Sequence, residues 1–143
     1  MVDARRTATA RFSVPFCDVD AMQVVWHGNY FKYFDAARDR LYCDAGIDLY
    51  RLVEDCGVVF PITRTQTKHI RPLRFRDDVV CTATLVEAKC RLVVDFEIRL
   101  AGDGSLCAKG RTEQAAVRLS DGSLELRLPD AIRRALGGDG DAG

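Results

Sequence analysis

The chain has no surplus of charge of either sign. Its 143 residues include 21 Lys and Arg and 21 Asp and Glu, so the formal net charge is zero. A general nucleic-acid binder usually carries a basic surplus, and we therefore expect no nucleic-acid partner. The sequence also lacks an apolar run of the roughly 20 residues that a membrane-spanning helix needs. The length fits one domain, placed at residues 1–136, and the Gly- and Asp-rich residues 137–143 predict a flexible tail.

Metal-binding residue types are scarce or poorly spaced. The chain has two histidines, and its six cysteines form no Cys-x-x-Cys pair. This spacing favours neither a zinc site nor a disulfide framework, so we predict no metal and no resident cofactor. The cysteines are interpreted as reduced and mostly buried small hydrophobic residues. The first eleven residues carry Asp and Arg without the apolar segment of a secretory signal, and we expect a cytoplasmic protein.

The hydrophobic pattern changes its period along the chain. Residues 10–16 alternate with period two, which is typical of a half-buried strand. From Tyr30 the apolar residues recur every three or four positions, which predicts one long helix that stops at Gly46. A shorter helix is expected at 48–56. Further strands are predicted at 58–70, 78–88, 91–101 and 105–119, with a last apolar alternation at 124–128 and a short helix up to Leu136.

One long helix followed by consecutive strands predicts an α+β fold. Short turns between successive strands give an antiparallel sheet, and the apolar face of the helix packs on one face of that sheet. An open sheet edge is commonly blunted or paired with a partner. We therefore expect a dimer with a continuous sheet.

The segment between the first strand and the long helix carries the polar groups that could perform chemistry. Asp18 and Asp20 lie in one loop, and an apolar stretch leads from them to His27 and to Asn29, the expected helix N-cap. A carboxylate can attack a carbonyl or activate water, and helix N-terminal amides can hold a developing oxyanion, so the segment suits acyl transfer. From residue types alone, two Asp residues that cap a turn explain the loop equally well. Likewise, residue types favour His27 as a packed residue over a general base or a metal ligand.

Two motifs place this segment in a wider context. The first has Asp-x-Asp at 18–20, a Val pair at 24–25, His-x-x-Tyr at 27–30 and Asp-Ala-Ala-Arg at 35–38. The second, at 71–78, reads Arg-Pro-Leu-Arg-Phe-Arg-Asp-Asp. Together they resemble the 4-hydroxybenzoyl-CoA thioesterase family of hot-dog proteins and its acyl-CoA thioesterase relatives. The resemblance implies an antiparallel sheet of five to six strands wrapped around one long central helix.

The resemblance also implies roles for individual residues. Asp20 takes the place of the catalytic carboxylate, as nucleophile or general base, and the backbone N–H of His27 takes that of the oxyanion donor. Asp18 and Tyr30 are implied supporting residues. Many family members have Gly in the loop after the second Asp, whereas this chain has Ala-Met-Gln at 21–23. The turn there is expected to differ, with an effect on the acyl pocket rather than on the reaction.

The implied substrate is a thioester of coenzyme A or of an acyl carrier protein. The resemblance further implies a homodimer or homotetramer with the site at the subunit interface. Lys89 and Arg91 lie where the family often holds CoA phosphates, although an ordinary solvated strand end explains them equally well. The basic run at 68–76 is instead expected to form surface ion pairs with Asp77 and Asp78.

Three other functions stay open. A hot-dog hydratase or dehydratase pairs a carboxylate with a catalytic histidine, and Asp20 with His27 is the only obvious pair here. A non-catalytic acyl-binding subunit of the same fold is the second alternative. The third is a haloacid-dehalogenase-like phosphatase, whose Asp-x-Asp loop is similar to residues 18–20, with Asp77 and Asp78 as later magnesium ligands. That fold needs strands and helices in alternation, which the pattern here does not favour.

Overall fold

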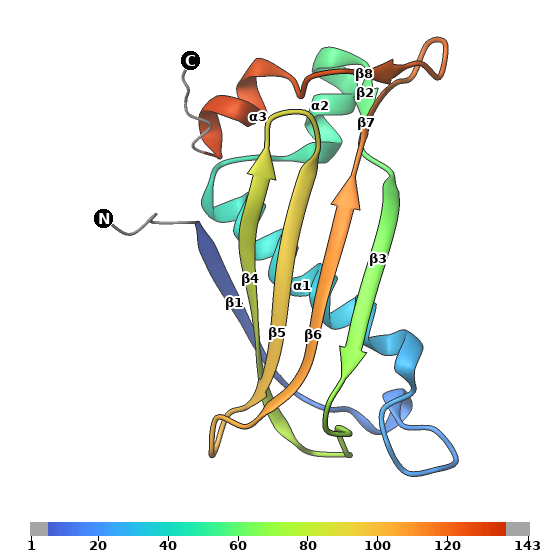
Figure 1. Cartoon of the computed structure of the whole chain (residues 1–143), viewed down its shortest axis with the longest axis vertical. Helices are drawn as coiled ribbons and strands as arrows, with labels where there is room; N and C mark the ends of the chain where they lie inside the picture. Colours follow the sequence, from blue (N-terminus) through green and yellow to red (C-terminus); the bar gives the residue numbers. More distant parts are fainter. Residues whose placement is uncertain (1–5, 137–143) are drawn as a thin grey trace.

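One long helix, α1, lies across one face of a five-stranded antiparallel sheet in the computed structural model, which describes residues 6–136 (Figure 1). The strand order is β1-β4-β5-β6-β3, so β1 and β3 form the two edges of the sheet. The predicted α+β class is confirmed, and the phosphatase alternative is wrong because no strand-helix alternation with a parallel sheet is present in the described chain. The bounds are β1 (Thr7–Ser13), α1 (Tyr30–Asp44), β3 (Ile62–His69), β4 (Asp78–Ala88), β5 (Leu92–Leu100) and β6 (Leu106–Gln114).

The two ends of the sheet carry different elements. Helices α2 and α3 lie at one end beside a small three-stranded sheet, ordered β2-β7-β8, which the sequence pattern did not predict (Figure 1). The long loop between β1 and α1, with two short 3₁₀ turns, lies at the other end. These elements are η1 (Phe16–Asp18), η2 (His27–Asn29), α2 (Leu49–Cys56), β2 (Val58–Val59), β7 (Ala116–Arg118), β8 (Leu124–Glu125) and α3 (Asp130–Ala135).

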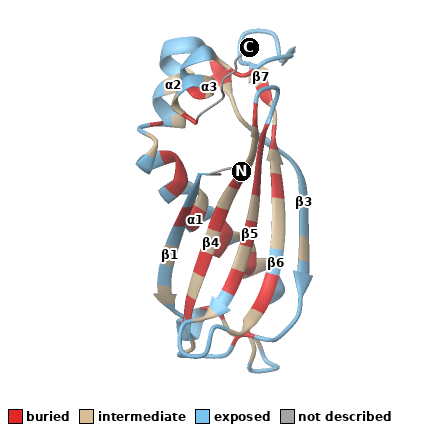
Figure 2. Cartoon of the chain, turned by 60° about the vertical axis from the view of Figure 1, so that its left-hand side comes forward, coloured by how far each residue is buried: buried red, intermediate tan, exposed pale blue. Residues whose placement is uncertain are grey.

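The core lies between α1 and the central strands. In β5 the predicted alternation is confirmed from Val94 onward, since Val94, Phe96 and Ile98 are buried and the residues between them are not, whereas Val93 is buried along with Leu92. Figure 2 shows buried positions recurring along β4 and β5. Such a period of two arises because successive side chains of a strand point to opposite faces. Phe34 of α1 is fully buried and stacks on Phe96, with 4.6 Å between ring centroids. This contact sets the long helix against the middle of the sheet.

Several expectations need correction. The cysteines are not mostly buried: Cys81 and Cys107 are buried, while the other four are exposed. Asp77 and Asp78 do not pair with the basic run, because Asp77 accepts the backbone N–H of Arg74 at 2.8 Å and Asp78 accepts the Ser13 hydroxyl. The tail predicted at 137–143 lies outside the described residues, and the single domain over 1–136 stays a prediction.

No helix within residues 6–136 is both long enough and apolar enough to cross a membrane.

Candidate active site

Asp20 is fixed by a tight turn. Its backbone N–H donates to the carbonyl of Val24 and its carbonyl accepts from Gln23, both at 2.9 Å. Its Oδ1 accepts the N–H of Met22 at 2.8 Å, so the turn-capping role considered for Asp20 is present. Gln23 has a φ of 67°, a left-handed conformation that glycine adopts at least cost. The loop thus contains a left-handed residue without a glycine, and the capping bond uses one of the two carboxylate oxygens.

Asp18 has a different environment from Asp20. It is 3% exposed, and its carboxylate accepts from Lys32 Nζ at 2.5 Å and from the Tyr33 hydroxyl at 2.7 Å. Burial acts to raise the pKa of Asp18, but the hydrogen bonds from Lys32 and Tyr33 and the positive charge of Lys32 outweigh it and hold that pKa below its usual range. Lys32 and Tyr33 are in the first turn of α1, so Asp18 ties the loop to the helix.

Asn29 supports the same loop in a way that the sequence did not predict. The residue directly precedes α1 as expected, but its side chain makes no capping hydrogen bond. Its Nδ2 donates instead to the carbonyl of Asp18 at 2.9 Å, and the N–H of Trp26 donates to the same carbonyl at 3.0 Å. The 3₁₀ turn η2 explains the difference, because it leads the backbone into α1 and leaves the Asn29 side chain free to hold the loop.

The start of the helix offers backbone donors. Turn η2 continues directly into α1, so the N–H groups of His27 and Gly28 precede the first complete helical turn. Within residues 6–136, neither N–H donates to a backbone carbonyl. The first N–H groups of a helix lack intrahelical acceptors and carry partial positive charge. This end of the helix can therefore bind a negatively charged oxygen.

A pocket of about 240 Å³ brings the predicted residues together. The loop and the helix start contribute Asp20, His27 and Tyr30 to its lining, and the end of strand β3 with the residues after it contributes residues 69–72. Asp18 does not line the pocket, because it points toward α1. The roles assigned to these residues stay predictions. The full lining is Asp20, Met22, Val24, Val25, His27, Tyr30, His69, Ile70, Arg71 and Pro72.

His69 and Arg71 are pocket residues that the sequence reasoning missed. His69 ends strand β3, and its ring lies edge-on to the ring of Tyr30, with 4.5 Å between centroids and 89° between planes. Arg71 Nη1 also donates to Ser105 Oγ at 3.0 Å. Because His69 pairs with the inward-facing Ala108 of β6, the alternation of β3 was the signal that could have separated it from its basic neighbours.

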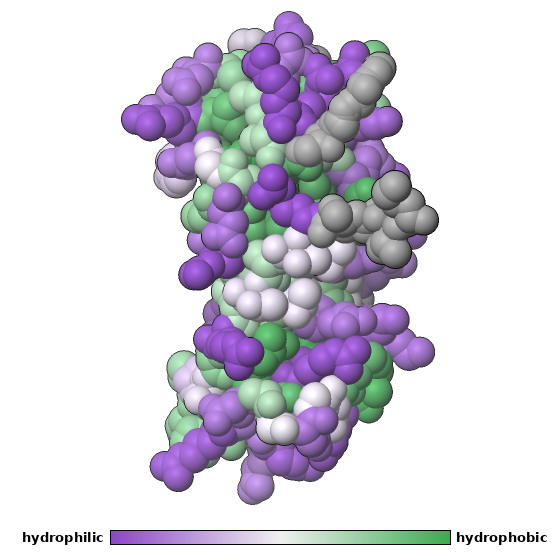
Figure 3. All heavy atoms as spheres, turned by 90° about the vertical axis from the view of Figure 1, so that its left-hand side faces the viewer, coloured by the Kyte–Doolittle hydropathy of each residue, from purple (hydrophilic) through white to green (hydrophobic). Residues whose placement is uncertain are grey.

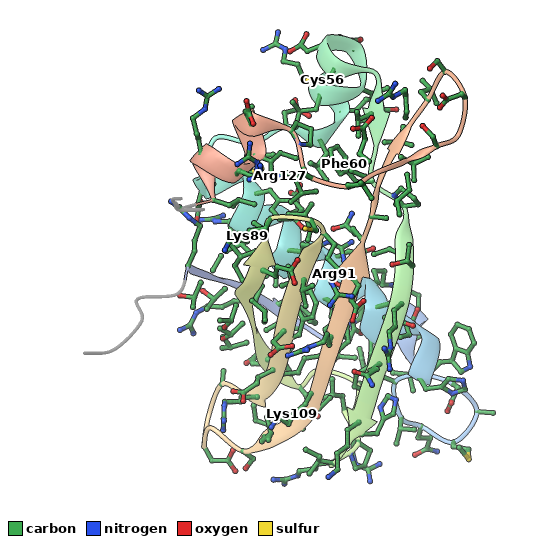
Figure 4. The ribbon with its side chains drawn as sticks, turned by 45° about the horizontal axis from the view of Figure 1, so that its top comes forward. Cys56, Phe60, Lys89, Arg91, Lys109 and Arg127 are labelled. Atoms are coloured by element: carbon green, nitrogen blue, oxygen red, sulfur yellow. The ribbon has the colours of Figure 1, made fainter. Side chains whose placement is uncertain are left out.

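Lys89 and Arg91 lie far from this pocket within one chain. They are in the β4–β5 turn, whereas the pocket lies at the other end of the strands (Figure 1). The 11 residues of β4 between the two ends span roughly 35 Å at about 3.3 Å per residue. Arg91 is held by Glu113 at 2.8 Å, and Lys89 is exposed. Figure 4 shows Arg127 at the same end, and the Leu128 N–H donates to the Lys89 carbonyl at 2.7 Å.

A wider cleft of about 940 Å³ lies at the α2 and α3 end, away from Asp20. Two of its arginines are engaged with carboxylates, Arg118 with Glu125 and Arg133 with Asp130. This cleft is larger than the pocket beside Asp20, but it contains no carboxylate beside the start of a long helix. The smaller pocket therefore has the chemistry for acyl transfer, and we place the candidate active site there.

Among residues 6–136, no group of three or more His, Cys, Asp or Glu side chains is arranged to hold a metal ion. The absence of a metal requirement stays a prediction.

Comparison with known proteins identifies the family. Residues 14–136 match the thioesterase-like superfamily. A 1,4-dihydroxy-2-naphthoyl-CoA hydrolase of Rippkaea orientalis is 30% identical over 113 residues, which cover 78% of this chain and 79% of that protein. The 1,4-dihydroxy-2-naphthoyl-CoA thioesterase of Synechocystis superimposes with a TM-score of 0.84 at 20% identity, over 92% of this chain and 96% of that one. A variant of 4-hydroxybenzoyl-CoA thioesterase in complex with 4-hydroxybenzoyl-CoA gives 0.82 at 17% identity, over 92% and 99%.

The chain belongs to the thioesterase-like superfamily. The predicted hot-dog fold and the predicted enzyme class, a thioester hydrolase, are confirmed at this level.

Proposed function

We propose that the protein hydrolyses an acyl-CoA thioester in the pocket beside Asp20. The observation that carries this proposal is the placement of one turn-fixed carboxylate and one helix start in the same pocket. Hydrolysis needs a group that attacks the carbonyl or activates water, and donors that hold the oxygen as it becomes negative. Asp20 supplies the first and the His27 N–H the second.

The proposed reaction has two possible forms. As a nucleophile, Asp20 attacks the thioester carbonyl and gives a mixed anhydride that water opens. As a general base, Asp20 removes a proton from the water that attacks. In both forms the carbonyl oxygen becomes negative beside η2, where free amides stabilise it without rearrangement.

The pocket lining supports an acyl group with a flat apolar body. Val24, Val25, Ile70 and Pro72 supply apolar walls, and Tyr30 supplies an aromatic one. The Rippkaea and Synechocystis relatives act on an aromatic CoA thioester, and we extend that class of substrate to this chain. Exposed apolar side chains near the loop, with Met22 76% and Trp26 51% exposed, can cover the substrate or a second subunit.

Thiol release tests the proposed function. A panel of aromatic and straight-chain acyl groups, each on coenzyme A and on an acyl carrier protein, should show free thiol accumulating with enzyme concentration, fastest for aromatic acyl-CoA. Release from the carrier-protein esters alone would show that the substrate is an acyl-carrier-protein thioester and not an acyl-CoA. If no ester on the panel releases thiol above the enzyme-free rate, the alternatives of a hydratase or an acyl-binding subunit replace the thioesterase. We also propose a cytoplasmic location, as the absence of a secretory segment in the first eleven residues suggests.

We further propose a homodimer formed through strand β3. This edge strand is exposed along most of its length and ends at the pocket, in His69. The opposite side of the molecule, over β1, mixes hydrophilic side chains with small hydrophobic areas (Figure 3). A two-fold axis that pairs two β3 strands antiparallel reverses the ends of the partner. Lys89 of the partner subunit and Arg91 of the partner subunit then lie at the same end as Asp20, which reconciles their distance within one chain with a role in phosphate binding.

Light scattering is expected to give a mass at least twice the 15.9 kDa of the chain. Activity per subunit should fall on dilution once the dimer dissociates, because the partner completes the phosphate site. A monomer at micromolar concentration with full activity would contradict both the dimer and the shared site.

Charge reversal tests the phosphate role. Replacing Lys89 and Arg91 together by Glu should raise KM for acyl-CoA severalfold and change kcat much less, because phosphate contacts are similar in the ground state and the transition state. The matched control reverses two exposed cations, Arg99 on β5 and Lys109 on β6, of which Lys109 is labelled in Figure 4. An unchanged KM in the Lys89 and Arg91 variant would show that these residues are ordinary solvated surface residues that do not bind the CoA phosphates.

A further inference from the structure

Both histidines of the chain reach the pocket that contains Asp20. His27 belongs to the same segment as Asp20, whereas His69 lines the pocket from the end of β3. The proposed thioesterase mechanism uses the backbone of His27 and gives His69 no task. A catalytic role for the His69 imidazole would add a second side chain to the proposed thioesterase mechanism, and it rests on that proposed function.

His69 is positioned but not chemically engaged. Its ring packs edge-on against Tyr30, which is 3% exposed and therefore gives the contact a rigid base. Within residues 6–136 no hydrogen bond involves the imidazole nitrogens, and the residue is exposed at the pocket. Imidazole is the side chain whose charged and neutral forms are both accessible near neutral pH. His69 can therefore give or accept a proton at the pocket wall.

The nucleophilic form of the reaction has a step that needs a proton donor. When a carboxylate adds to a thioester, the intermediate can expel either the carboxylate or the thiolate. An aspartic acid has a pKa of about 4 and a thiol of about 8.5, so the carboxylate is the better leaving group and the intermediate tends to revert. Protonation of the sulfur as the C–S bond breaks reverses this preference. His69 is suitably placed to be this donor, because it lines the same pocket as Asp20 but belongs to a different segment from the nucleophile and the oxyanion donor.

We propose that His69 is a catalytic residue that protonates the departing sulfur. The Asp20 oxygen bonds to the carbonyl carbon, the C–S electron pair goes to sulfur, and His69 gives its proton to form the free thiol. Water then adds to the acyl carbonyl of the anhydride, neutral His69 accepts a proton from that water, and Asp20 leaves as a carboxylate. The second step restores the protonated imidazole, so one proton passes from water to thiol in each turnover.

Dependence on the leaving group tests this role. His69→Gln should lower the single-turnover rate of thiol release from an acyl-CoA ester by on the order of 10², the scale of a lost general acid. With the same acyl group on 4-nitrothiophenol, whose thiolate leaves without protonation, the single-turnover rate of thiol release should stay close to that of the unmodified enzyme. His69→Phe retains the aromatic contact with Tyr30 and should show the same selective loss, so the result does not depend on packing. Lys68→Gln, on the outer face of the same strand, is the matched control.

The outcomes distinguish a failure of the His69 role from a failure of the proposed thioesterase function. Selective loss with the alkyl thioester in both His69 variants supports the proposal. Equal loss with both esters, or no loss with either, overturns it. If the unmodified enzyme releases no thiol from either ester, the proposed function itself fails and this inference with it.

Discussion

Replacing Asp20 with Asn is expected to lower kcat by on the order of 10² or more, the scale of a lost acid-base or nucleophilic group. The amide keeps the shape of the side chain, and its oxygen can still accept the N–H of Met22, so the turn should persist. Only the negative charge is removed. Steady-state thiol release, with circular dichroism to confirm the fold, measures the effect.

Asp18→Asn is the matched control, because it makes the same chemical change two residues away. Asp18 is buried against Lys32 and Tyr33 rather than at the pocket. Removing the Asp18 charge should cost about 1.5–3 kcal/mol of stability, the range for a hydrogen bond to a charged group. It should lower kcat less than the change at Asp20 does. Near-normal kcat in a folded Asp20→Asn variant would show that this loop does not contain the catalytic carboxylate.

Gly110→Ala is expected to destabilise the fold through a single added methyl group. A Cβ at this position would lie 2.4 Å from Cε2 of Phe34, a fully buried ring that also stacks on Phe96, the cross-strand neighbour of Gly110. The ring cannot move without breaking that stack, so overpacking should cost about 1–3 kcal/mol. The midpoint of urea unfolding should fall with little change in its slope.

Gly102→Ala provides the comparison, since a Cβ there meets no atom within 4 Å. It should leave the unfolding midpoint nearly unchanged. Equal stability of the Gly110 and Gly102 variants would show that the contact between Phe34 and β6 does not set the position of α1. Because α1 begins at the pocket, the Gly110 variant should also move the His27 amide and lower kcat.

The sequence predicts local elements well where side chains face a single environment. The alternation at Leu92, Val94, Phe96 and Ile98 predicts both strand β5 and its buried face, because one face of the sheet meets the helix and the other does not. Likewise, the spacing of Tyr30, Phe34 and Leu41 predicts the buried face of α1. Motif spacing also predicts the approach of Asp20 to the helix start, since both belong to one short segment.

Contacts between segments that are distant in the sequence are harder to predict from local sequence patterns. His69 lies within a run of basic residues, so the sequence alone gives no reason to assign it to the pocket. Its pairing with β6 and its place in the pocket lining are visible only in the fold. Asp18 and Asp20, two apart, should point to one side if the loop were extended. The 3₁₀ turn η1 and the tight turn after Asp20 rotate them apart, so that one meets α1 and the other the pocket. Such turns depend on tertiary partners that a local pattern does not contain.

The position of the bound thioester tests the central claim most directly. A crystal structure of the Asp20→Asn variant with the best acyl-CoA substrate should place the thioester carbonyl carbon against the substituted side chain. The carbonyl oxygen should lie within hydrogen-bond distance of the His27 N–H. A thioester bound in the cleft between α2 and α3, or one at Asp20 whose carbonyl faces away from η2, would contradict the account.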